Sequence, residues 1–235
     1  MIAISKVIKG ANMKYKAVIF DLFETLVTEW GHKKYTKNEL CSDLGIARSE
    51  FDLYWDEREE ERYTGALTFE ESIEYVCERC GKCADKSVIH NIIDKRVKTK
   101  SVCFDHIIPE VFEMLSYLKS KGLKMAIISN CSSEEVTVLK DSALYTSFDE
   151  VILSYEVNKK KPDPCIYIEA AQRLGLEPAD CIFVGDGGSN ELTGAKNVGM
   201  TAVQAKWYTD QMPKKRGGID GVPAADKPMD IINFI

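Results

Sequence analysis

Three short apolar runs in the sequence each lead to residues that can take part in phosphoryl transfer. AVIF leads to Asp21, MAII leads to Ser129 and Asn130, and CIFV leads to Gly185 and Asp186. A carboxylate such as that of Asp21 can attack phosphorus and form an aspartyl phosphate, provided that a cation offsets the repulsion between the two anions. Asp21 would therefore need positive charge and hydrogen-bond donors nearby.

Candidates for these supporting roles follow in order along the chain. Phosphoryl transfer needs a small donor to the transferring oxygens, a fixed positive charge and a magnesium site built from hard oxygen ligands. Ser129 and Asn130 suit the first role, Lys161 in KKKPDP suits the second, and Asp186, Asn190 and Glu191 in GDGGSNE suit the third. Each residue alone also fits ordinary turn chemistry, so the prediction depends on their combination.

The segments that would position these residues alternate between strands and helices. Residues 16–21, 124–130, 181–186 and 201–207 are short apolar runs that predict buried strands of a parallel sheet. Amphipathic helices are predicted at 109–122 and 163–175, each ending at a glycine. This alternation predicts a doubly wound α/β core, in which ligands bind beyond the carboxyl ends of the strands.

Residues 30–100 interrupt the alternation, because they are charged, contain few strand signals and indicate several helices. Thr68 and Glu71 form a capping box that predicts the start of one of these helices. We therefore expect an inserted helical cap at 30–100, a core made of 13–29 and 101–235, and an N-terminal extension at 1–12. Cys77, Cys80 and Cys83 have a metal-like spacing, but Cys77 and Cys80 lie on the apolar stripe of the helix, which favours core packing.

Composition excludes several classes of function. A net charge of -6 disfavours a general nucleic-acid binder, since phosphate backbones attract clustered Lys and Arg. Apolar runs are much shorter than a membrane span, and the N-terminus lacks the continuous apolar segment of a signal peptide. We expect a soluble, cytoplasmic protein with reduced cysteines, whose partner is a small molecule rather than nucleic acid or a membrane.

The four polar blocks, in their order and spacing, resemble those of the haloacid dehalogenase superfamily, most of whose members are magnesium-dependent phosphohydrolases. The resemblance extends from Lys16 to about Val203 and implies a Rossmann-like core with a helical cap of the first type. It implies a nucleophile at Asp21, a phosphoryl-binding hydroxyl at Ser129 and an orienting amine at Lys161. Metal ligation is implied for Asp21 and Asp186, the Phe23 carbonyl, and Asn190 and Glu191 beside them, while Asn130 and Thr25 are further candidates for phosphate binding.

Phe23 departs from the family pattern, because phosphatases of the family usually have a second aspartate there that protonates the leaving oxygen. Positioned acid–base catalysis typically contributes about 10² to 10⁴ in rate, so alkyl phosphates should be poor substrates. Glu24 replaces a common glycine and is a candidate for a displaced acid. Substrates with good leaving groups, such as acyl or aryl phosphates, would depend less on the missing group.

Three functions stay open at this point. The leading prediction is a magnesium-dependent phosphohydrolase that acts on a small phosphorylated metabolite through phospho-Asp21. A phospholigand-binding or regulatory protein on a degenerate core is the second, because Phe23 and Glu24 replace usual motif residues. The third is a metal-independent dehalogenase, which an aromatic residue at position 23 favours and the retained Asp186 and Glu191 disfavour. A phosphonate-cleaving relative that uses a cap lysine makes Lys33 and Lys34 minor candidates.

Overall fold

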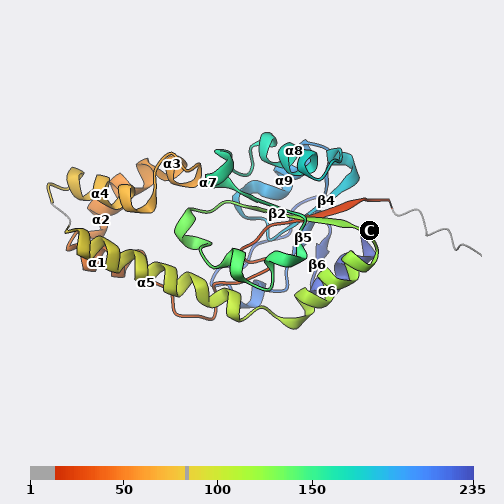
Figure 1. Cartoon of the computed structure of the whole chain (residues 1–235), viewed down its shortest axis with the longest axis horizontal. Coiled ribbons are helices and arrows are strands. Elements are labelled where there is room, and N and C mark those ends of the chain that lie inside the picture. Colours follow the sequence, from red (N-terminus) through yellow and green to blue (C-terminus); the bar gives the residue numbers. More distant parts are fainter. Residues whose placement is uncertain (1–13, 83–84) are drawn as a thin grey trace, which may run out of the picture.

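The computed structural model describes residues 14–82 and 85–235, and within them the strands form one parallel sheet (Figure 1). The predicted extension at 1–12 and Cys83 lie outside these residues. The sheet has the order β3-β2-β1-β4-β5-β6. Its strands are β1 (Ala17–Phe20), β2 (Lys124–Ser129), β3 (Glu150–Leu153), β4 (Cys181–Gly185), β5 (Thr201–Ala205) and β6 (Ala224–Ala225). The predicted α/β, Rossmann-like fold class is confirmed.

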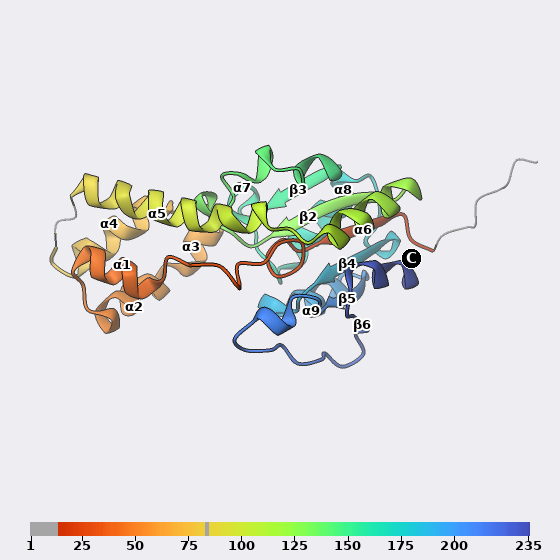
Figure 2. The ribbon, with the colours of Figure 1, turned by 90° about the horizontal axis from the view of Figure 1, so that it is seen from below.

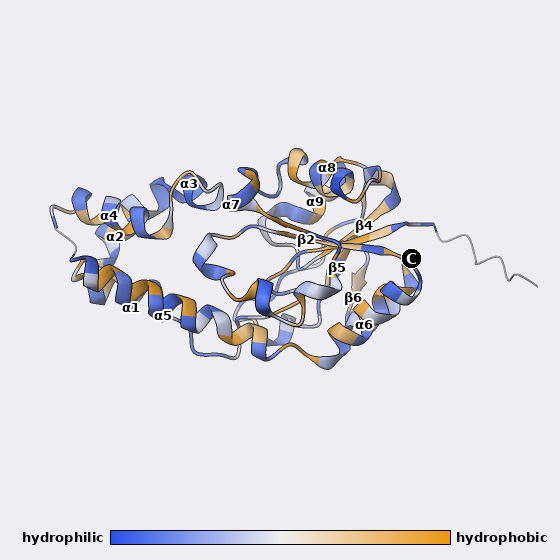
Figure 3. Ribbon diagram, viewed as in Figure 1, coloured by the Kyte–Doolittle hydropathy of each residue, from blue (hydrophilic) through white to orange (hydrophobic). Residues whose placement is uncertain are grey.

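Successive residues of β1 face opposite sides of the sheet, and each side packs against helices. Val18 and Phe20 belong to one buried apolar cluster, which includes side chains of α6 (Pro109–Ser120). Ile19 belongs to a second cluster, which includes side chains of α8 (Pro164–Arg173) and α9 (Glu191–Asn197). Figure 3 shows the resulting concentration of apolar residues in the central strands. Helices on both faces of a parallel sheet make the core doubly wound.

Helices α1 to α5 gather at one end of the molecule, beyond the carboxyl ends of the strands (Figures 1 and 2). They are α1 (Lys37–Leu44), α2 (Arg48–Glu57), α3 (Glu59–Tyr63), α4 (Phe69–Arg79) and α5 (Lys86–Asp105). Helices α1, α2, α4 and α5 enclose an apolar cluster of their own, in which Cys77 is buried and against which Cys80 packs. The α4 helix starts at the predicted capping box, since Thr68 and Glu71 each accept a backbone N–H of the other.

Short helical segments complete the described chain. They are α7 (Ser154–Val157) and the 3₁₀ segments η1 (Ser133–Glu135), η2 (Leu139–Asp141), η3 (Tyr145–Ser147), η4 (Pro178–Asp180), η5 (Gly188–Asn190), η6 (Thr209–Gln211) and η7 (Pro228–Asn233). No helix within residues 14–82 and 85–235 has the length and apolar character needed to cross a membrane.

Candidate active site

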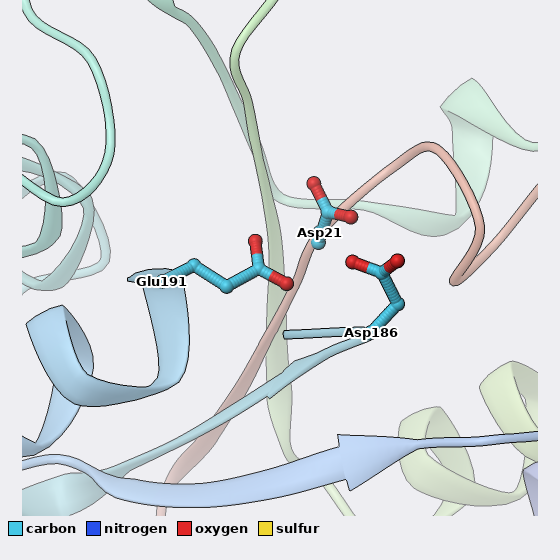
Figure 4. Close-up of side chains that lie close together, drawn as sticks. All are labelled: Asp21, Asp186 and Glu191. Carbon is cyan, nitrogen blue, oxygen red and sulfur yellow. The ribbon is translucent and has the colours of Figure 1, made fainter. Parts of the chain in front are cut away.

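The register of the sheet brings Asp21 and Asp186 together. Phe20 pairs with Val184 across β1 and β4, and the Asp21 N–H continues the ladder to the Val184 carbonyl at 2.8 Å. Asp21 and Asp186 thus leave neighbouring strands at the same edge of the sheet. Glu191 reaches the same point from the first residue of α9, and Figure 4 shows the three carboxylates converging. Each contributes an oxygen to a group whose members lie within 4.8 Å of one another, and all three side chains are buried.

Gly185 makes room for Glu191. A Cβ atom at Gly185 would lie 2.2 Å from Glu191 Oε1, so any larger residue there would displace the carboxylate. The same oxygen accepts a hydrogen bond from the Gly187 N–H at 3.0 Å. Gly185 therefore has a specific steric role, which is to let the start of α9 approach the end of β4.

Lys161 is the positive charge of the site. Its Nζ donates to Asp21 Oδ1 and lies 2.5 Å from Glu191 Oε2, and only 3% of its side chain is exposed. Asn130 fixes the backbone of the same residue: its amide Nδ2 donates to the Lys161 carbonyl at 2.8 Å and its Oδ1 accepts the Lys161 N–H at 2.7 Å. Asn130 was predicted to bind phosphate, but its side-chain amide forms hydrogen bonds to the backbone of Lys161 instead.

Burial and mutual repulsion shift the acidities of this group. The pKa of Asp21 is raised, chiefly because burial disfavours its charge, with Asp186 adding repulsion against the attraction of Lys161. Burial and the neighbouring Asp21 raise the pKa of Glu191 to about 8. Burial also opposes the charge of Lys161, but Asp21 and Glu191 outweigh it and raise the Lys161 pKa. The carboxylates thus favour additional positive charge.

The two hydroxyl groups predicted to bind phosphate have different surroundings. Ser129, at the end of β2, is 1% exposed and its Oγ has no hydrogen-bond partner among the described residues. A buried hydroxyl without a partner is costly, so an acceptor on a ligand would stabilise it. Thr25 is fully buried, and its Oγ1 donates to Asp21 Oδ2 at 3.3 Å, which makes it a neighbour of the predicted nucleophile.

The Glu24 side chain points back into the turn that follows Asp21. Glu24 has a positive φ of 62°, which explains why a glycine is suited to this position. Its carboxylate accepts the Thr28 hydroxyl at 2.5 Å and the Glu29 N–H at 3.1 Å, and burial raises its pKa. The loop after β5 also holds the turn, because the Trp207 indole N–H donates to the Thr25 carbonyl at 2.8 Å.

Asn190 and Arg216 have unexpected positions. Asn190, a predicted metal ligand, is exposed and has left-handed backbone angles just before α9. Arg216 comes from the basic segment between β5 and β6, and its Nε lies 2.5 Å from Asp186 Oδ2. The two groups form an ion pair, although the N–H is not aligned for a hydrogen bond. Sequence reasoning missed Arg216, since the segment has the composition of an exposed loop.

Asp21, Asp186 and Glu191 fit a magnesium ion. Mg²⁺ takes oxygen ligands and is usually held by one or two carboxylates, with waters and substrate phosphate completing its shell. Buried carboxylates this close repel one another, and a divalent cation would offset that repulsion together with Lys161. The Phe23 carbonyl is a further predicted ligand from the same turn. Phe23 itself is half-buried, with its ring centroid 4.9 Å from Lys100 Nζ.

An ion-pair network joins α5 to the core beside this turn. Arg96 binds Glu134 and Glu135 at 2.8 and 2.7 Å, and Lys100 binds Glu135 and Glu29 at 2.7 and 2.5 Å. Both glutamates of η1 have side chains that are only 6% exposed. Removing one charge from such a poorly hydrated network would leave its partners buried without compensation, which is destabilising. These ion pairs therefore attach α5 to the core.

A cavity of about 150 Å³ extends between helices α1 to α5 and the loop at Ser132. Its lining includes three cations, Lys37, Arg62 and Arg96. Lys37 pairs with aspartates of α2, and Arg96 belongs to the network above. Arg62 is 6% exposed, stacks on the Trp55 ring and donates to a backbone carbonyl, but forms no ion pair with any described residue. Its charge is the least compensated of the three.

Comparison with known proteins agrees with this geometry. A model of the haloacid dehalogenase-like hydrolase family matches residues 15–199. A glyceraldehyde 3-phosphate phosphatase of Methanopyrus kandleri is 26% identical over 230 residues, which cover 94% of this chain and 97% of that protein. Among solved structures, a phosphatase of the same superfamily from Thermococcus onnurineus has a TM-score of 0.60 at 23% identity, covering 93% of this chain and 97% of that one. A 2-haloacid dehalogenase from Pseudomonas syringae has a TM-score of 0.64 at 21% identity with the same coverage, and both likenesses concern the fold alone. Because the family model matches most of the chain, the protein belongs to the haloacid dehalogenase-like hydrolases.

Proposed function

We propose that the protein is a magnesium-dependent phosphatase that acts on a small phosphorylated metabolite through an aspartyl phosphate at Asp21. The observation that carries the proposal is the buried group in which Lys161 links Asp21 to Glu191, with Asp186 beside them. This group supplies a nucleophile, a fixed positive charge and a cation site at one edge of the sheet. The M. kandleri relative, named as a phosphatase of a small phosphorylated compound, supports the same reaction class.

The reaction divides into two displacements at phosphorus. An oxygen of Asp21 attacks the phosphorus, and the bond from phosphorus to the leaving oxygen breaks. Water then attacks the same phosphorus, breaks its bond to Asp21 and releases inorganic phosphate. Ser129 donates its free hydroxyl to a phosphoryl oxygen, and Lys161 holds Asp21 in place while compensating the anionic charge. A magnesium ion at the carboxylates would supply further charge neutralisation.

Phe23 restricts the substrate, because its ring cannot donate a proton to the leaving oxygen. Glu24, the predicted displaced acid, is bound to Thr28 and Glu29 in the turn, so it would have to leave both partners to act. The preferred substrates therefore carry leaving groups that depart as stable anions.

Initial rates on an aryl phosphate and an alkyl phosphate of equal charge, each with Mg²⁺ and with EDTA, test the proposal. We expect magnesium-dependent hydrolysis of the aryl ester with much slower release from the alkyl ester. Asp21→Asn should abolish turnover while the exposed control Asp141→Asn retains it. Full activity of Asp21→Asn would refute the aspartyl-phosphate mechanism.

The alternatives have distinct outcomes in the same experiment. Halide release from a 2-haloacid that persists in EDTA would establish dehalogenation instead. Tight binding of phosphorylated ligands without turnover would favour a regulatory protein on a degenerate core. Phe23 is the reason to test this alternative, because its ring cannot donate a proton to a leaving oxygen. Turnover on the order of 1 s⁻¹ or faster would exclude that second alternative.

A further inference from the structure

The Arg216 side chain reaches one of the predicted metal-binding carboxylates from a distant part of the sequence. Its Nε lies 2.5 Å from Asp186 Oδ2, while the other oxygen, Oδ1, accepts the Gly188 N–H at 2.9 Å. Both oxygens of Asp186 therefore already face a donor or a positive charge. The Arg216 side chain is 42% exposed, so it can move into solvent, whereas the Asp186 side chain is only 6% exposed.

Specific contacts hold the segment of Arg216 against this carboxylate. The buried amide of Gln204 donates from Nε2 both to the Gly217 carbonyl at 3.0 Å and to the Asp186 carbonyl at 3.1 Å. One side chain thus ties the residue after Arg216 to Asp186. Gly188 leaves space for the guanidinium, because a Cβ atom there would lie 2.9 Å from Arg216 Nη2. The arginine therefore occupies a prepared position.

A guanidinium and a divalent cation compete for the carboxylate of Asp186, so each weakens the binding of the other. Arginine stays protonated at any physiological pH, so its charge cannot be removed by losing a proton. Magnesium binds carboxylate oxygens at about 2.0 to 2.1 Å and demands near-octahedral geometry, so it competes with the guanidinium for the Asp186 oxygen Oδ2. Two positive charges at this separation also repel each other in a buried site.

We propose that Arg216 is a built-in competitor of the magnesium ion at Asp186, a role that presupposes the magnesium site of the proposed function. Arg216 compensates the carboxylates when no cation is bound and leaves Oδ2 when one binds. Each binding event must therefore break the ion pair, so Arg216 lowers the affinity of the site for the cation. Release of the guanidinium also couples the segment between β5 and β6 to metal binding.

Calorimetric titration with MgCl₂ tests this role without relying on activity. Arg216→Gln should bind Mg²⁺ about tenfold more tightly than the unaltered protein, a ratio that corresponds to the loss of one charge-assisted contact. Arg216→Lys keeps a positive charge and should stay closer to the unaltered protein. The matched control is Lys215→Gln, which removes a neighbouring charge that pairs with Asp210 instead of the site.

Each outcome of the titration decides the question. Equal or weaker binding by Arg216→Gln, with binding by the unaltered protein intact, overturns the competition and leaves the proposed phosphatase untouched. An equal gain in Lys215→Gln also overturns it, because the effect would then be a general change in surface charge. Absence of Mg²⁺ binding in every variant refutes the magnesium site and the competition together. Circular dichroism spectra that match the unaltered protein establish that the variants are folded.

Discussion

Glu135 offers a quantitative test of the network that attaches α5 to the core. Burial opposes its ionisation, but Lys100 and Arg96 outweigh burial and lower the Glu135 pKa from 4.5 to about 2. Since one pKa unit corresponds to about 1.4 kcal/mol, the network favours the ionised form in the folded state by about 3 kcal/mol. Glu135→Gln keeps the size of the side chain and an acceptor for the Ser132 N–H, but removes the charge. We therefore expect it to lower the free energy of unfolding at pH 7 by about 3 kcal/mol.

Urea unfolding followed by circular dichroism, repeated at several pH values, measures this difference. A carboxylate whose pKa is lower in the folded state stabilises the fold above its unfolded pKa and loses that contribution as the pH falls through its folded pKa. The difference between the unaltered protein and Glu135→Gln should therefore shrink from about pH 4.5 to about pH 2. Glu169→Gln is the control, because Glu169 pairs with lysine and arginine at the surface and should matter little. A difference that is constant over this pH range would refute the electrostatic explanation.

Three further substitutions probe the site. Phe23→Asp should raise kcat on an alkyl phosphate by about 10², because it restores a group that can protonate the leaving oxygen. This factor is at the lower end of the usual range for acid catalysis, since Lys100 lies beside position 23 and favours the ionised form of the aspartate, which cannot donate a proton. Asn130→Ala should lower kcat and cost about 1 to 3 kcal/mol of stability, measured by urea unfolding, since it frees the backbone of Lys161 and leaves its buried polar groups without partners. Arg62→Gln removes a cation that lines the cavity beside Ser132 and has no ion-pair partner among the described residues. It should therefore raise KM about tenfold for a phosphate ester whose leaving group carries a carboxylate, and should change KM little for an ester with a neutral leaving group. The control for this last comparison is Arg58→Gln, whose charge is already paired with Glu61.

Most of the core could be predicted from the sequence because buried parallel strands are apolar throughout and end abruptly in polar residues. This pattern predicted β1, β2, β4 and β5. It did not predict β3, whose first two residues are only half-buried at the edge of the sheet, or β6, which has two residues in a segment rich in proline, glycine and lysine.

The candidate site, like the fold, could be predicted only in part from the sequence. Asp21, Asp186 and Glu191 follow strands or begin a helix, so topology alone predicts that they meet. The position of Arg216 depends on a contact with a residue thirty positions earlier, and Arg216 itself lies in an irregular segment after β5, where no periodicity predicts the contact. The binding of Asn130 to Lys161 and of Glu24 to Thr28 depends on side-chain directions that residue type does not determine.

The hydrogen bond from Trp207 to the Thr25 carbonyl gives the protein an optical probe of the turn that follows Asp21. Indole emission responds to nearby charge and hydration, and this ring is held to a residue whose hydroxyl contacts Asp21. Trp30 precedes α1 and Trp55 lies in α2, so replacing both with phenylalanine leaves Trp207 as the only tryptophan. Stopped-flow fluorescence of that variant would then follow charge changes at Asp21 in real time, without a labelled substrate.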